Sequence, residues 1–156
     1  PNINGIIVRP VVAPRITATG QRITMTITDH AHAAIVSLTQ YESANYHNDL
    51  NTARGHLLDT MRHVVAISKL TPAKPDYRLP QRWENTDRLC MYMRCMDALT
   101  AVLFLQYQST FNDPRNHLGN AWVECSRLAE HHGWLLPALP GAPAAIATER
   151  PLLARR

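Results

Sequence analysis

Apolar residues recur at helical spacing through most of the chain, and the longest such stretch runs from Asn85 to Gln108. It contains no Gly or Pro, and Met, Leu and Ala dominate its interior, so we expect one long helix capped by Thr86 or Asp87. Its two apolar stripes are Tyr92, Met96, Leu99 and Leu103, and Met91, Cys95, Ala98, Val102 and Leu105. The second half is apolar almost all round, which predicts burial by neighbouring helices.

Three further stretches show the same periodicity. The first begins at Asp29 or His30, with Thr28 or Asp29 as its cap, and ends near Tyr46. The second covers about 52–70, with Arg54, Asp59 and Arg62 expected on its outer face. The third covers about 114–132, where Pro114 suits a first helical position and Gly133 suits a C-cap. Short links after the first and third helices predict antiparallel neighbours.

Residues 1–28 have a different pattern, because β-branched residues dominate and one segment, 22–27, alternates polar with apolar side chains. Pro10 and Pro14 favour an edge strand or an extended segment. We expect a β-hairpin or an extended arm. A lone two-stranded ribbon is barely stable, so the arm should pack on the helices or pair with another chain.

These patterns predict a mainly α chain that forms a single domain over residues 1–156. A β arm (1–28) precedes a four-helix bundle-like core (29–132), and an irregular tail rich in Pro and Ala follows (133–156). Hydrophobic residues make up 46% of the chain, which is enough for a real core. The apolar run 98–105 is far shorter than the ~20 residues that a membrane span needs. No signal-peptide layout is present, so we expect a cytoplasmic protein and no membrane association.

The net charge of +4 is unevenly distributed. Residues 1–28 carry Arg9, Arg15 and Arg22 and no acid, and residues 149–156 carry three Arg against one Glu. The body, 29–148, holds ten Lys or Arg and eleven Asp or Glu. The basic character therefore belongs to the two ends, which argues against a broad nucleic-acid-binding face and leaves basic arms as an option.

One connecting segment combines basic and aromatic residues, which in single-strand-binding grooves hold phosphates and stack on bases. The residues are Lys69, Lys74, Tyr77, Arg78, Arg82 and Trp83. The competing interpretation is a surface loop whose Trp contributes to the core. Together with Arg9, Arg15 and Arg22, these residues are the predicted partner-binding set.

Eight histidines invite a search for metal ligands. The best cluster is His56, Asp59 and His63, which lie three and four residues apart on one face of the second helix. With a fourth ligand from elsewhere, this set would suit a metal-dependent hydrolase. The competing interpretation is a polar helix face. The three cysteines, Cys90, Cys95 and Cys125, show no pairing pattern and are expected to be small buried side chains.

No glycine-rich phosphate loop, no nucleophile elbow and no Cys-x-x-Cys pair occurs in the sequence, so no cofactor is predicted. The function that fits best is a non-enzymatic accessory or regulatory protein. It would act by binding a macromolecule: a protein partner or a second copy first, and nucleic acid second. The metal-dependent hydrolase is the alternative.

Overall fold

The computed structural model describes the backbone of residues 2–3, 6–7, 15–16 and 22–23 and of the segments 24–71, 87–105 and 114–141. Four helices make up most of this: α1 (Ile27–Tyr46), α2 (Leu50–Leu70), α3 (Arg88–Leu105) and α4 (Pro114–His131). The expectation of a mainly helical chain is confirmed. The strands are two residues each and pair antiparallel: β1 (Asn2–Ile3) with β2 (Ile6–Ile7), and β3 (Arg15–Ile16) with β4 (Arg22–Ile23).

Several predictions fall on residues outside these ranges. Most of the 1–28 arm, the basic and aromatic segment from residue 72 to residue 86, and the tail beyond residue 141 are not among the described residues. The hairpin or arm, the irregular crossing and the outer tail therefore stay predictions.

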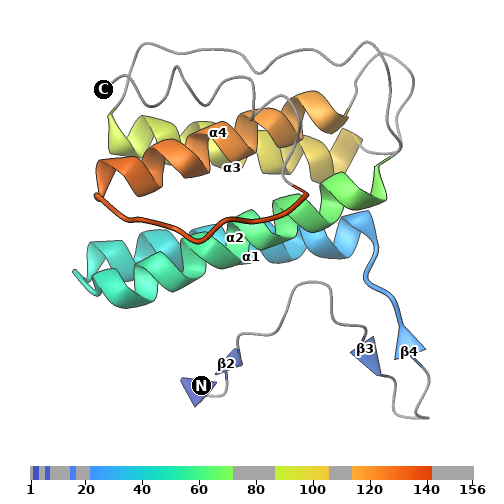
Figure 1. Cartoon of the computed structure of the whole chain (residues 1–156), viewed down its shortest axis with the longest axis horizontal. Coiled ribbons are helices and arrows are strands. Elements are labelled where there is room, and N and C mark those ends of the chain that lie inside the picture. The colour runs from blue at the N-terminus through green and yellow to red at the C-terminus, as the bar shows by residue number, and fades with distance from the viewer. Residues whose placement is uncertain are drawn as a thin grey trace.

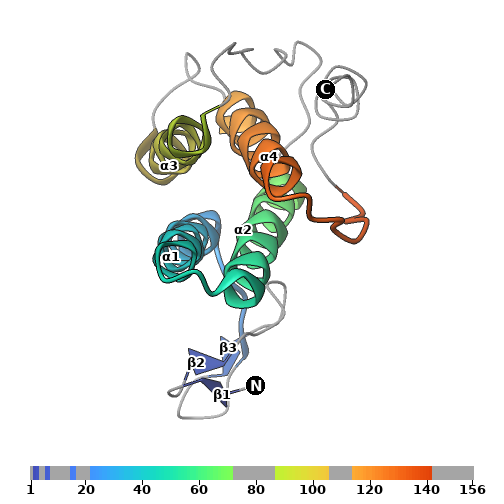
Figure 2. The same ribbon diagram turned by 90° about the vertical axis from the view of Figure 1, so that its left-hand side faces the viewer.

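The helices pack as two pairs, α1 with α2 and α3 with α4, and the pairs lie against each other through α1–α3 and α2–α4 contacts. Seen nearly end-on, the four helices surround one core (Figure 2). The members of each pair run side by side in opposite directions, as the short link between α1 and α2 requires (Figure 1). The largest fully buried apolar side chains come from all four helices: Leu38, Tyr41, Leu57, Val64, Ile67, Met91, Leu99, Val102, Leu118 and Leu128.

The first two helices begin earlier than predicted, because their caps lie further upstream. Thr26 caps α1: its Oγ1 accepts from the Asp29 N–H at 3.1 Å, and Asp29 Oδ2 accepts from the Thr26 N–H at 3.0 Å. Thr28 and Asp29 are therefore inside the helix. Asp49 caps α2 through its Oδ1, which accepts from the Thr52 N–H at 3.3 Å. The connection between α1 and α2 is consequently only residues 47–49.

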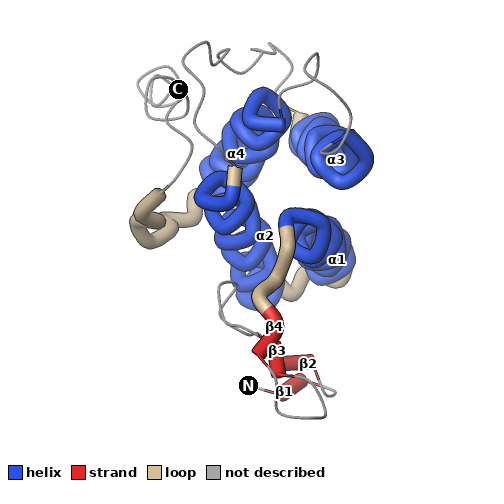
Figure 3. The backbone as a smooth tube through the Cα atoms, turned by 90° about the vertical axis from the view of Figure 1, so that its right-hand side faces the viewer, coloured by secondary structure: helices blue, strands red, loops and turns tan. Residues whose placement is uncertain are grey.

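The segment 134–141 follows α4 and lies along α2 (Figures 1 and 3). Arg54 Nη2, near the start of α2, donates to the Leu135 carbonyl at 2.8 Å, and Gly141 lies beside Lys69 near the end of α2. Trp134, Leu136 and Leu139 are half-buried against the core. This part of the tail thus covers the edge between α2 and α4, as irregular structure without a helix.

Candidate functional site: an apolar face on α3

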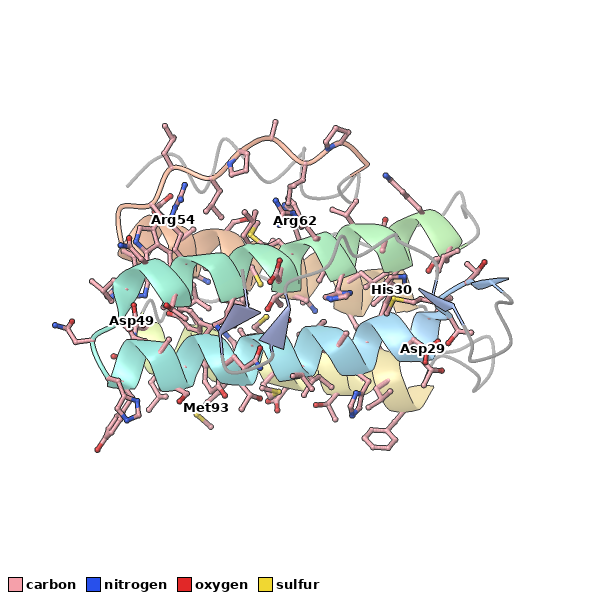
Figure 4. All side chains as sticks on the ribbon, turned by 90° about the horizontal axis from the view of Figure 1, so that it is seen from below. Asp29, His30, Asp49, Arg54, Arg62 and Met93 are labelled. Carbon is pink, nitrogen blue, oxygen red and sulfur yellow. The ribbon has the colours of Figure 1, made fainter. Side chains whose placement is uncertain are left out.

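The outer side of α3 exposes large apolar side chains. Leu89 is 48% exposed, Met93 55% and Phe104 66%, and half-buried Met96 and Thr100 lie between them. These positions are separated by three or four residues, so they share one face of the helix. Met93 lies at the outer edge of the bundle (Figure 4). The prediction that neighbours bury the second half of α3 is wrong for Phe104, because among the described helices α3 packs against α1 and α4 alone.

The edge of α1 continues this face. Arg88, at the start of α3, contacts Glu42 near the end of α1, and Tyr92 one turn later lies against Thr39. The two helices therefore run antiparallel, which places Val36 of α1, 40% exposed, at the level of Met96. We call the set Val36, Leu89, Met93, Met96, Thr100 and Phe104 the α3 face.

The six residues of the α3 face are uncharged, while exposed Asp97 lies at its border, one turn after Met93. The ion pair at the end of the face is formed within the chain. Arg88 donates to both Glu42 carboxylate oxygens, at 2.7 and 3.1 Å, and to the Tyr41 hydroxyl at 3.3 Å. The hydrogen bonds to Glu42 raise the pKa of Arg88 further above its usual range. Because this guanidinium is held by a bidentate pair, it is directed towards α1 and Tyr41.

A cleft of about 220 Å³ lies between α3 and α4. Its lining residues are Arg94, Asp97, Ala98, Ala101, His117, Asn120 and Glu124. Buried Glu124 accepts from Arg94 Nε at 3.0 Å and from Arg127 Nη1 at 3.5 Å, so its charge is balanced by two guanidinium groups. Among the lining residues that the structure describes, there is no Ser, Cys or Thr nucleophile beside a base. We interpret the Arg94–Glu124–Arg127 set as an ion triad that joins the two helices.

A buried histidine pair lies between α1 and α2. The Nδ1 atoms of His30 and His63 are 3.0 Å apart, so one imidazole donates to the other. Burial, together with the neighbouring His30, lowers the pKa of His63 to about 4. Burial also lowers the pKa of His30, partly offset by Asp29. Both rings are thus held in the neutral form at pH 7.

The structure gives His63 and Asp59 of the predicted metal set different partners, whereas His56 and Asp59 lie close enough for their charges to interact. His63 is buried against His30, whereas Asp59 accepts from Arg62 Nη1 at 3.2 Å. Asp59 was expected on the outer face but is buried, and burial raises its pKa. His56 is half-buried. In the described part of the chain, no three His, Cys, Asp or Glu side chains lie close enough to hold a metal ion. The hydrolase hypothesis therefore gains no geometric support.

An aromatic cluster closes the end of the bundle where α4 finishes. His132 stacks on Trp134, with ring centroids 4.0 Å apart, and its Nε2 lies 2.8 Å from the hydroxyl of buried Tyr41. Sequence periodicity does not identify this contact, because Tyr41 and His132 are far apart in the chain. The cluster fixes the start of the 134–141 segment on the core.

Little of the predicted partner-binding set falls on described side chains. Lys69 is exposed in the last turn of α2. Arg15 and Arg22 belong to β3 and β4, where the structure gives the backbone only. The remaining members lie outside the described residues: Arg9, Lys74, Tyr77, Arg78, Arg82 and Trp83.

Comparison with known proteins gives no relative: no family model, no curated protein and no solved structure matches the chain. Among the described residues, no helix is both long enough and apolar enough to cross a membrane. The α3 face is the feature that sequence analysis missed. The sequence contained one sign of this face. Phe104 shares the polar side of the helix with Arg94 and Asp97, and the polar side of a helix faces solvent.

Proposed function

We propose that this protein is a non-enzymatic helical binding protein that docks another protein chain on the α3 face, and that this chain is a second copy of itself. The observation that carries the proposal is the exposure of Leu89, Met93 and Phe104 along one side of α3. From Leu89 to Phe104 the helix rises by roughly 22 Å. A contiguous exposed apolar strip of this kind is typical of protein interaction sites.

Self-association is favoured by the charge of the face. A two-fold interface brings one patch against an identical patch, so any uncompensated charge on it would meet itself. The six residues of the α3 face are uncharged, and Arg88 at its end is paired with Glu42 of the same chain. Exposed Asp97 lies at the border of the face, one turn after Met93. Thr100, between Met96 and Phe104, offers a small side chain into which a large one from the partner can pack.

The native mass of the full chain, measured over a range of concentrations, tests the proposal. We expect a concentration-dependent dimer. Met93→Glu and Phe104→Glu should each weaken association by about 10- to 100-fold, because a buried unpaired carboxylate would be placed in the interface. Leu135→Glu is the matched control, since Leu135 is 89% exposed but lies on the tail, away from the α3 face.

Two results would contradict the proposal. One is a monomer at every concentration. The other is a dimer that Leu135→Glu disrupts as strongly as Phe104→Glu does. Absorbance at 260 and 280 nm, recorded at low and moderate salt, tests the second candidate partner. Nucleic acid that co-purifies and dissociates as salt rises would instead favour charge-driven binding through the basic ends.

A further inference from the structure

Two buried thiols meet at the interface between α3 and α4. Cys95 Sγ and Cys125 Sγ lie 3.4 Å apart, and both side chains are fully buried. Cys95 Sγ is also 3.6 Å from the Ala121 carbonyl oxygen, to which it donates. At this separation no other atom fits between the two sulfurs. The third cysteine, Cys90, is half-buried and lies five residues before Cys95 on α3, so it points in a different direction.

The thiol pair is adjacent to the ion triad. Arg94 and Glu124, which pair at 3.0 Å, each immediately precede one of the two cysteines in the chain. The ion pair and the sulfur contact therefore connect α3 and α4 at the same level of the bundle. Any change in the distance between the sulfurs must be accommodated next to a buried carboxylate.

We propose that Cys95 and Cys125 are a redox modification site, at which a hydroperoxide converts the two thiols into a disulfide that locks α3 to α4. In the first step one thiolate sulfur attacks the peroxide, giving a sulfenic acid and one molecule of water or alcohol. In the second step the other thiol attacks this sulfur, which forms the S–S bond and releases water. Two cysteines are oxidised, and one peroxide bond is reduced.

Burial determines how fast this happens. The thiolate is the nucleophile, and the contact with Cys125 together with burial raises the pKa of Cys95 well above its usual range. Hydroperoxide is small enough to reach a core position when α3 and α4 separate briefly. We therefore expect slow oxidation at neutral pH, and faster oxidation as pH rises or as mild denaturant favours opening.

The disulfide would change both the distance between the helices and the stability of the protein. The sulfurs must approach from 3.4 Å to a bond length of about 2.05 Å, which draws α3 and α4 together beside Arg94 and Glu124. The cross-link also encloses the whole connection between the two helices. It restricts the unfolded chain, so the oxidised protein should have a higher Tm than the reduced protein, and a thiol reductant should reverse the shift.

The sequence makes the site directly measurable, because trypsin separates the three cysteines. Cleavage after Arg88, Arg94, Arg115 and Arg127 gives peptides 89–94, 95–115 and 116–127, with one cysteine each. The full chain is treated with hydrogen peroxide, its remaining thiols are alkylated, and the digest is analysed by mass spectrometry without reduction. We expect peptides 95–115 and 116–127 to be joined, with two hydrogens lost, and peptide 89–94 to be alkylated.

Cys90→Ala is the matched control and should retain both the cross-link and the rise in Tm. Cys95→Ala and Cys125→Ala should each abolish both, and the use of two variants guards against misfolding of either one. Three results would overturn the proposal: a cross-link that involves Cys90, sulfinic acid at Cys95 or Cys125 without a cross-link, or unmodified thiols even in mild denaturant.

Discussion

The two helix pairs of the bundle bury polar groups in opposite ways. Between α1 and α2, the Nδ1 atoms of His30 and His63 lie 3.0 Å apart, and burial keeps both rings neutral. Between α3 and α4, Glu124 is buried as part of an ion triad with Arg94 and Arg127, next to two thiols. Both pairs are antiparallel, yet they should respond to different conditions: the first to acid, and the second to loss of a charge or to an oxidant.

The difference arises because the first interface is stable only while its histidines stay neutral, and the second only while its ion triad stays complete. Burying two neutral imidazoles carries only a small desolvation penalty. When one ring binds a proton, a charge is buried, and the stability that the pair contributes is lost. An ion triad is stable only while all partners are present, because a buried guanidinium without its carboxylate has lost both water and its counter-charge. Substitutions that perturb one helix pair at a time measure the two contributions separately.

The largest effect is expected in the α3–α4 pair. Glu124→Leu leaves Arg94 and Arg127 without their shared carboxylate, so the free energy of unfolding should fall by about 3–5 kcal/mol. Urea denaturation measures this change. Glu42→Gln is the comparison, since it weakens the half-buried Arg88–Glu42 pair and should cost only about 1 kcal/mol. An equal fall in the free energy of unfolding in the two variants would show that burial does not make the triad contribute more than the half-buried pair.

A smaller and pH-dependent effect is expected in the α1–α2 pair. His63 binds its proton at about pH 4 when folded but near pH 6.5 when unfolded, so between these values the unfolded chain binds more protons. The stability contribution is therefore complete above about pH 6.5 and falls by about 3 kcal/mol as pH drops to about 4. Urea denaturation at stepwise lower pH measures the loss.

His63→Gln should flatten this pH dependence, because it removes the described histidine whose pKa is lowered most. His32→Gln should leave it unchanged, since His32 is exposed on the opposite side of α1 from His30. Asp59, whose pKa is raised by burial, contributes with the opposite sign near pH 4, so the comparison between the two variants isolates the histidine. A slope that survives in His63→Gln would assign the acid sensitivity to another group.

The sequence predicts the helices well, but not their exact ends or the contacts between them. Apolar periodicity identifies four helices and most of their buried stripes, because burial on one side of a helix imposes that spacing directly. The cap at Thr26 was missed since Thr28 and Asp29 are equally suitable residue types, and only the reciprocal hydrogen bonds distinguish Thr26. The positions of such boundaries depend on local geometry that residue type alone leaves open.

The candidate sites were harder to predict, because each depends on contacts between helices. His63 was grouped with His56 and Asp59 of its own helix, whereas its partner is His30 of α1. Cys95 and Cys125 are separated by 29 residues in the chain and meet only through the α3–α4 packing. The α3 face could not be predicted for a related reason. The apolar sequence of α3 indicates burial, but how much of the helix is covered depends on how all four helices pack.

The smallest predicted effects come from two glycines, one in each half, and they should have opposite signs. Gly133 ends α4 with a φ of 73°, while its N–H donates to the Glu130 carbonyl at 3.0 Å and the Trp134 N–H donates to the Ala129 carbonyl at 2.9 Å. Gly133→Ala forces a Cβ into this left-handed conformation and should destabilise the protein by about 1 kcal/mol.

Gly55 lies inside α2, and an added Cβ there meets no atom within 4 Å. Gly55→Ala should therefore stabilise by about 0.5–1 kcal/mol through helix propensity alone, as thermal unfolding of the two variants would measure. If both substitutions changed stability in the same direction, the left-handed cap would not be what holds the end of α4 and the start of the 134–141 segment in place.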